Sequence, residues 1–194
     1  MERAHFILDF WLGPEIERRQ PKPEFQKRWW AKSDELDQEI SEKFADDIEA
    51  AAEGKLDDWL GEPRGRLAQV ILLDQFTRNV HRNDYMMYEY DSLARGLTLE
   101  GLQLKHDASL KAAEKQFLYM PLMHSEELVH QDRALELFKQ LAADNDWMGP
   151  ALDSAKVHRQ IVERFGRFPH RNALMDRTST GDEMVFLDKP GSSF

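Results

Sequence analysis

The stretch from Gly65 to Val80 constrains the fold most, because it combines an apolar segment with several groups that cannot be buried alone. Val70-Ile71-Leu72-Leu73 is apolar on every side, which is typical of a helix buried all round. Asp74, Gln75, Arg78 and Asn79 follow directly, and each needs a polar partner once it leaves water. We therefore expect a central helix near residues 63–81, beginning after Glu62-Pro63, that takes polar groups into the core.

The rest of the chain is organised as further helices. Phe6, Ile7, Phe10 and Trp11 have helical spacing within residues 2–12, and Gly13-Pro14 ends that segment. Helices are also expected over residues 34–53, 91–104, 107–120, 125–143 and 151–165, with Pro121 forcing a kink or a new start at about Ser125. No segment shows the alternation of a strand. The prediction is an all-α fold of about eight helices in a single domain, residues 1–194.

The composition limits the classes of function. The chain has no cysteine, which excludes disulfides, thiolate nucleophiles and cysteine-ligated metals. Its net charge of −10 argues against a nucleic-acid partner. No run approaches the ~18 apolar residues that cross a bilayer, and no signal peptide is evident, so we expect a soluble, cytoplasmic protein with no membrane partner.

The charges are unevenly distributed along the chain. Residues 34–62 contain twelve acidic residues and only two lysines, whereas residues 156–177 contain six basic residues and two acidic ones. Such a division indicates either two solvated faces that attract each other or a basic pocket for a small anion.

Catalytic and metal-binding motifs are weak. Glu127-x-x-His130 has the spacing of a di-metal helix bundle, but the other such pair, Glu2-x-x-His5, lies at the start of the chain, so no metal site is predicted. His124 and Glu127 with a third ligand remain an alternative. The chain has no Gly-x-Ser-x-Gly elbow and no glycine-rich phosphate loop. No cofactor is assigned.

Four segments resemble the bacterial domain of unknown function 924 family, in the same order along nearly the whole chain. They are Phe10–Gly13, Ile71–Asn79, Tyr119–Glu126 and Glu163–Asn172, followed by a similar C-terminus from Phe186 to Phe194. The chain departs from the family pattern at Thr77, where proline is usual, and at Leu12, where an aromatic residue is usual. The resemblance implies an all-helical fold similar to tetratricopeptide-repeat domains and leaves the biochemical role unassigned.

Polar residues in apolar surroundings mark the candidate site. We expect His124, Glu127 and His170 as acid or base groups, and the following as ligand-binding groups: Asp74, Arg78, Asn79, Arg164, Arg171 and Asn172. Arg78 and Arg171 would hold a carboxylate or phosphate by bidentate contacts.

Three readings of this set remain open. The favoured one is a binding protein whose inner polar pocket takes a small anionic molecule or a peptide. An enzyme using His124 or His170 as acid or base is the second. The third is a purely structural network, in which Asp74 and Arg78 pair at i, i+4 spacing and the other groups satisfy one another.

Overall fold

The computed structural model describes residues 1–192, and every regular element within them is a helix. The all-α prediction is therefore confirmed. The elements in chain order are α1 (Glu2–Leu12), η1 (Glu15–Glu17), α2 (Pro23–Trp30), α3 (Asp34–Ala52), η2 (Asp57–Trp59), α4 (Pro63–Val70), η3 (Ile71–Phe76), α5 (Thr77–Val80), η4 (Tyr85–Tyr88), α6 (Asp91–Gln103), η5 (His106–Ser109), α7 (Ala112–Met123), α8 (Leu128–Asp144), η6 (Asp146–Met148), α9 (Gly149–Phe165), η7 (Pro169–Arg171) and α10 (Gly181–Leu187).

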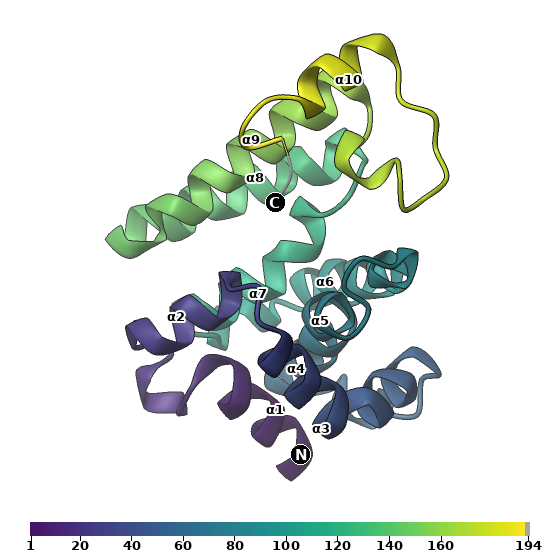
Figure 1. Ribbon diagram of the computed structural model, residues 1–194. Helices are drawn as coiled ribbons and strands as arrows, with labels where there is room; N and C mark the ends of the chain where they lie inside the picture. Colours follow the sequence, from purple (N-terminus) through teal and green to yellow (C-terminus); the bar gives the residue numbers. More distant parts are fainter. Residues whose placement is uncertain (193–194) are drawn as a thin grey trace.

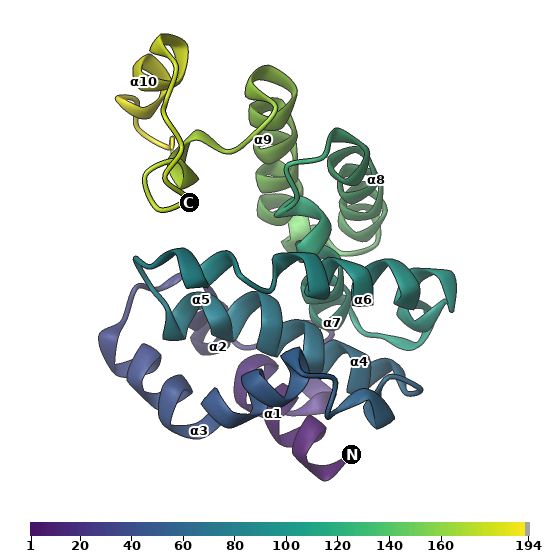
Figure 2. The ribbon, with the colours of Figure 1, turned by 90° about the vertical axis from the view of Figure 1, so that its right-hand side faces the viewer.

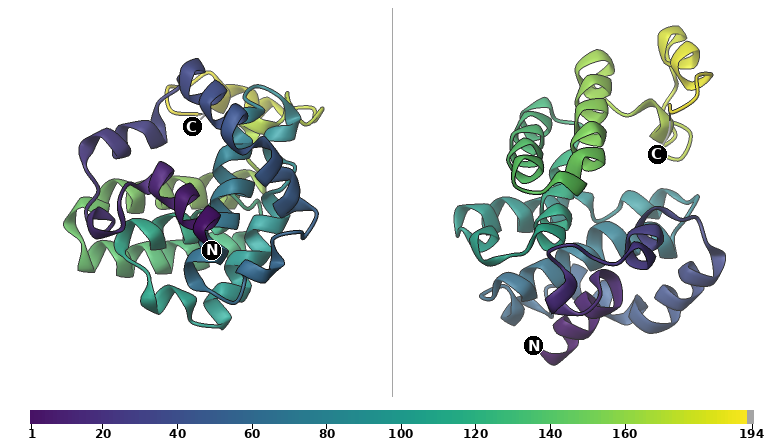
Figure 3. Two further views of the ribbon diagram at one scale, coloured as in Figure 1. Left: turned by 90° about the horizontal axis from the view of Figure 1, so that it is seen from below. Right: turned by 90° about the vertical axis from the view of Figure 1, so that its left-hand side faces the viewer.

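The helices form a lower body and an upper pair, joined by α7 (Figures 1 and 2). Helices α1 to α6 make up the lower body, where α1 and α6 both pack on α4 and α3 packs on η3 and α5. Helices α8 and α9 pack along each other above this body. The segment after α9 leaves the helix pair. Helix α10 then lies on the side of α9 away from α8 (Figures 2 and 3).

The central helix is continuous from Pro63 to Val80 through α4, η3 and α5, and residues 65–77 are all buried. The predicted buried helix near 63–81 is thus confirmed. Its middle turn, η3, is a π-helix, which the sequence did not predict. At the start of α4, a Cβ on Gly65 would lie 2.3 Å from the carbonyl oxygen of Trp59, so only glycine permits this close approach.

The helix ends agree with expectation at some places and differ at others. Helix α1 ends before Gly13, whose φ of 81° favours glycine. Two expected boundaries are wrong. Helix α7 begins at Ala112 rather than 107, and α8 begins at Leu128 rather than Ser125. Pro121 lies inside α7, where burial of nearly the whole helix offsets the missing backbone hydrogen bond.

One large hydrophobic core joins the helices of the lower body to α7 and α8, and a small second cluster of Ile161, Val162 and Phe168 lies at the end of α9. In residues 1–192, none of the helices combines the length and apolarity needed to cross a membrane. The elements around the candidate site are therefore the central helix, the end of α7, α9 and the segment after α9.

Candidate functional site

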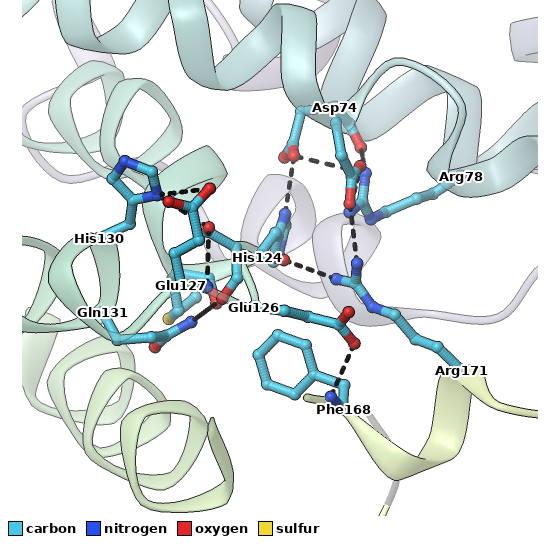
Figure 4. Close-up of polar contacts among 12 residues, drawn as sticks. Asp74, Arg78, His124, Glu126, Glu127, His130, Gln131, Phe168 and Arg171 are labelled. Atoms are coloured by element: carbon cyan, nitrogen blue, oxygen red, sulfur yellow. Dashed lines mark hydrogen bonds and ion pairs between the residues drawn. The ribbon is translucent and has the colours of Figure 1, made fainter. Parts of the chain in front are cut away.

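Asp74 is the most buried charged group of the site, with no exposed side-chain surface. It lies on the π-helical turn η3. One carboxylate oxygen lies 2.7 Å from Nδ1 of His124 and 3.3 Å from a guanidinium nitrogen of Arg78, and the other accepts a hydrogen bond of 2.6 Å from Gln75 (Figure 4). Burial alone would raise the pKa of Asp74, but His124 and Arg78 outweigh it and hold that pKa below its ordinary value.

His124 follows the last residue of α7 and presents one edge of its ring to Asp74. An ionised carboxylate can only accept, so Nδ1 of His124 carries the proton and donates it to Asp74. The other ring nitrogen, Nε2, has no hydrogen-bond partner within residues 1–192, and the side chain is 12% exposed. A neutral His124 therefore keeps a lone pair on Nε2, on the edge of the ring away from Asp74.

Arg78 and Arg171 lie on either side of the Asp91 carboxylate. Arg78 is 2.8 Å from one oxygen of Asp91, and Arg171 donates to the other at 3.0 Å. Arg171 also donates to the backbone carbonyl of His124 at 2.9 Å (Figure 4). The predicted pair of arginines around a carboxylate is present, but the carboxylate belongs to the chain itself. The sequence placed Asp91 only at the start of an expected helix over residues 91–104, and nothing in the local pattern indicated its contacts with the two arginines.

Tyr88 covers the two arginines on their outer side. Its ring centroid lies 4.4 Å from the guanidinium carbon of Arg171 and 5.8 Å from that of Arg78. These distances are typical of cation–π contacts. Burial, the largest influence, raises the pKa of the Tyr88 hydroxyl. Arg171 and Arg78, whose own partners are Asp91 and Asp74, therefore hold the ring of Tyr88 in place.

Two further histidines approach His124 from the upper part of the molecule. The ring of His158, on α9, lies 6.3 Å from that of His124, and Phe168 lies 5.5 Å from His158 and 5.6 Å from His170. Burial lowers the pKa of His158 to about 3 and that of His170 to about 4. Both are neutral at pH 7, and Nδ1 of His158 donates to the Ser154 carbonyl at 2.8 Å.

Glu126 fastens the segment after α9 to the end of α7. Its carboxylate accepts hydrogen bonds from the Phe168 backbone at 2.8 Å and from Arg177 at 2.7 and 2.9 Å. Burial would raise the pKa of Glu126, but Arg177 and the Phe168 N–H outweigh it and lower that pKa. Together with Arg171, these contacts connect the C-terminal segment to His124 and its surroundings.

Four of the nine predicted site residues lie in this cluster around Asp74, and a fifth, His170, borders it. The structure places the other four elsewhere. Asn79 donates to Asp37 of α3 at 2.7 Å, and Asn172 donates to Ser179 at 3.0 Å. The Glu127 carboxylate lies 3.7 Å from His130, on the side of His124 away from Arg171 (Figure 4). Arg164 is exposed and lies over the ring of its neighbour Phe165 at 4.6 Å.

Sequence reasoning did not find Asp91, Tyr88, His158 or Glu126 as members of the cluster. His158 could have been suggested by its place on the apolar face of α9, but Asp91 and Glu126 are ordinary acids near helix starts. In the part of the chain that the structure describes, no three histidine or acidic side chains are arranged to hold a metal ion.

The pattern of the family described as "Bacterial protein of unknown function (DUF924)" matches residues 7–191. The chain belongs to this family. It is also similar to a solved structure of a protein of unknown function from Agrobacterium tumefaciens, with 36% identity and a TM-score of 0.84 over 96% of this chain and 97% of that one. No curated protein matches. The resemblance to the family is confirmed, and neither the family nor this neighbour is described with a function. The tetratricopeptide-like arrangement stays a prediction.

Proposed function

We propose that the protein is an enzyme in which His124 transfers a proton to and from a small polar substrate, with Asp74 orienting the imidazole. The observation that carries this proposal is the 2.7 Å contact between Nδ1 of His124 and the fully buried Asp74 carboxylate. A carboxylate in this position fixes the tautomer of the ring and stabilises the imidazolium that forms when Nε2 takes a proton.

The surroundings of Asp74 support a role beyond packing. Its carboxylate has Gln75 and Arg78 as further partners, so its orientation is already fixed before His124 is considered. It also lies on a π-helical turn, a rare element that occurs often at functional sites. His158, neutral at pH 7, adds an uncharged wall beside His124. A substrate would reach Nε2 along the exposed part of the His124 ring.

An activated ester tests the proposal without knowledge of the natural substrate. We expect p-nitrophenyl acetate to be hydrolysed faster by the protein than by free imidazole at equal concentration. General-base assistance is typically worth about 10²–10⁴-fold, so His124→Ala should return the rate to the imidazole background. His130→Ala is the matched control, because His130, in the first turn of α8, contacts Ser125 and Glu127 rather than Asp74.

A second variant tests the orienting role of Asp74 while the imidazole of His124 stays in place. Asp74→Asn leaves the imidazole in place but removes the carboxylate that orients it, so the rate should fall while the ¹⁵N NMR signals of His124 report a changed tautomer. Equal hydrolysis by the wild type, His124→Ala and Asp74→Asn would overturn the proposal and leave the network as scaffold.

A second candidate function, binding of a small anionic molecule or peptide carboxylate, is favoured by one observation. Arg78 and Arg171 contact the two oxygens of one carboxylate at 2.8 and 3.0 Å, which is the spacing that a ligand carboxylate or phosphate needs. Such a ligand would displace Asp91. If this function holds, inorganic phosphate and acetate raise the unfolding temperature of the wild type in proportion to the logarithm of their concentration, and Arg171→Met removes the effect.

A further inference from the structure

A hollow of about 420 Å³ lies on the other side of Tyr88 from the arginines. It is open to solvent and lies between η4 and the segment after η7, where it is lined by Tyr85, Tyr88, Glu89, Leu174, Met175 and Asp176. In Figure 2 the C-terminal segment lies directly above the stretch that joins α5 to α6, where η4 is found. This volume falls in the range of small-molecule sites in proteins. The hollow is separate from the edge of His124 that carries the proposed proton transfer.

The charges of the hollow are all negative. Glu89 and Asp176 are its charged residues, both are exposed, and neither forms an ion pair or a side-chain hydrogen bond with any residue from 1 to 192. The acids of the neighbouring cluster differ in this respect, because Asp91 and Glu126 each contact an arginine. Two carboxylates that lack a cation beside a cavity favour a cationic occupant.

The walls of the hollow suit the apolar part of such an occupant. Tyr85 and Tyr88 offer aromatic rings, which attract a cation through their faces, and Leu174 and Met175 offer aliphatic contact. Arg171 behind Tyr88 fixes the ring, at 4.4 Å from its centroid, so this wall is formed before any ligand arrives. The positive charges behind the ring do not repel a cation strongly, because Asp91 and Asp74 neutralise them.

We propose that this hollow binds a small organic cation, namely an ammonium group on a short apolar chain. The ammonium group faces Glu89 and Asp176, and the chain lies along Tyr85, Leu174 and Met175. The site is independent of the proton transfer at His124, so binding persists when that residue is replaced.

Three molecules of the same length and different charge test the proposal. Butylammonium, butanol and butyrate are titrated into protein labelled with ¹³C at the methyl groups of leucine and methionine. We expect butylammonium to shift the methyl signals of Leu174 and Met175 at millimolar concentration, and butanol and butyrate to shift them far less. His124→Ala should bind butylammonium as the wild type does, which separates this site from the proposed function.

Variants then assign the charge selectivity to the two acids. Glu89→Gln and Asp176→Asn each remove one exposed carboxylate, and we expect each to weaken butylammonium binding by up to about fivefold. Asparagine is chosen at position 176 because it tolerates the φ of 50° found there. Glu24→Gln, an exposed acid on α2, is the matched control and should leave the affinity unchanged.

Two results would overturn the proposal. Butanol or butyrate binding as tightly as butylammonium would show that the hollow has no preference for a cation. Full affinity in the double variant Glu89→Gln/Asp176→Asn would show that the two carboxylates do not contact the ligand. Both side chains are exposed, and neither forms an ion pair or a side-chain hydrogen bond with residues 1–192. The variants therefore retain the fold on which the titration depends.

Discussion

Replacing Asp74 with asparagine removes one negative charge from the middle of the molecule with little change in shape. Asparagine keeps one oxygen that accepts the hydrogen bond from Gln75, but it loses the charge-assisted contacts to His124 at 2.7 Å and Arg78 at 3.3 Å. Two such contacts are worth about 3–6 kcal/mol together. Arg78 keeps its contact with Asp91 and is 17% exposed, so water compensates for part of the loss. We expect the free energy of unfolding to fall by roughly 3 kcal/mol.

The assay is urea unfolding at pH 7, followed by circular dichroism and tryptophan fluorescence so that two-state behaviour is checked. A loss of roughly 3 kcal/mol corresponds to a melting temperature about 6–12 °C lower for a chain of this size. Asp153→Asn is the control, because Asp153 is 73% exposed and its contact with Lys156 is a surface ion pair, worth at most about 1 kcal/mol.

The pH dependence gives this prediction a second, independent check. The folded pKa of Asp74 lies below the ordinary value of about 3.9, so its contribution to stability is present above that pH and is lost as the pH falls toward the folded value. The difference between wild type and Asp74→Asn should therefore shrink below about pH 4. A difference under about 1 kcal/mol at pH 7, or one that grows on acidification, would refute the reasoning.

Three further predictions concern backbone space, histidine titration and the C-terminal segment. Gly65→Ala should destabilise the protein by about 1–3 kcal/mol in urea unfolding, because the new Cβ meets the Trp59 carbonyl. Gly96 lies inside α6 with open space around it, so Gly96→Ala should stabilise the protein by about 0.4–1 kcal/mol. His158 has a pKa of about 3 when folded and about 6.5 when unfolded, so the unfolded chain binds the extra proton and stability falls as the pH drops from 6.5 toward 3. His158→Gln should flatten this part of the stability–pH curve. An unchanged curve would contradict the low folded pKa of His158. Arg171→Met should accelerate trypsin cleavage of the segment after α9 severalfold, as measured by mass spectrometry, while cleavage elsewhere in the chain stays unchanged. Cleavage of this segment at the wild-type rate would show that Arg171 does not hold it in place.

Local patterns in the sequence predicted helix ends well where the deciding residues lie within one turn of each other. The stop at Gly13 and the start at Pro63 each depend on one or two residues, and the structure has both. The π-helical turn η3 could not be predicted, because a change from i→i+4 to i→i+5 hydrogen bonds leaves no mark in the residue pattern. The sequence predicted an interruption at Pro121, but α7 continues through it to Met123, because burial of the helix outweighs the local preference of proline.

The candidate site was predictable only in part, for a related reason. Asp74 and Arg78 share a helix face, and their i, i+4 contact follows from helical spacing. The contacts between Asp74 and His124 and between Asp91 and Arg171 join residues 50 and 80 positions apart. Helical periodicity carries no information about such pairs. Asn79, one position beyond Arg78, points to α3 instead, which a list of polar residues in apolar surroundings does not reveal.

The contacts of Arg171 also decide when the site can form during synthesis. Asp91 and His124 emerge from the ribosome 80 and 47 residues before the arginine that binds them both. Until then, the helices of the lower body can pack on the central helix, but His124 lacks the hydrogen bond to its carbonyl and Tyr88 lacks the guanidinium behind it. The site therefore cannot be complete before Arg171 has been synthesised, and a chain truncated after α9 would have a hydrophobic core without a finished site.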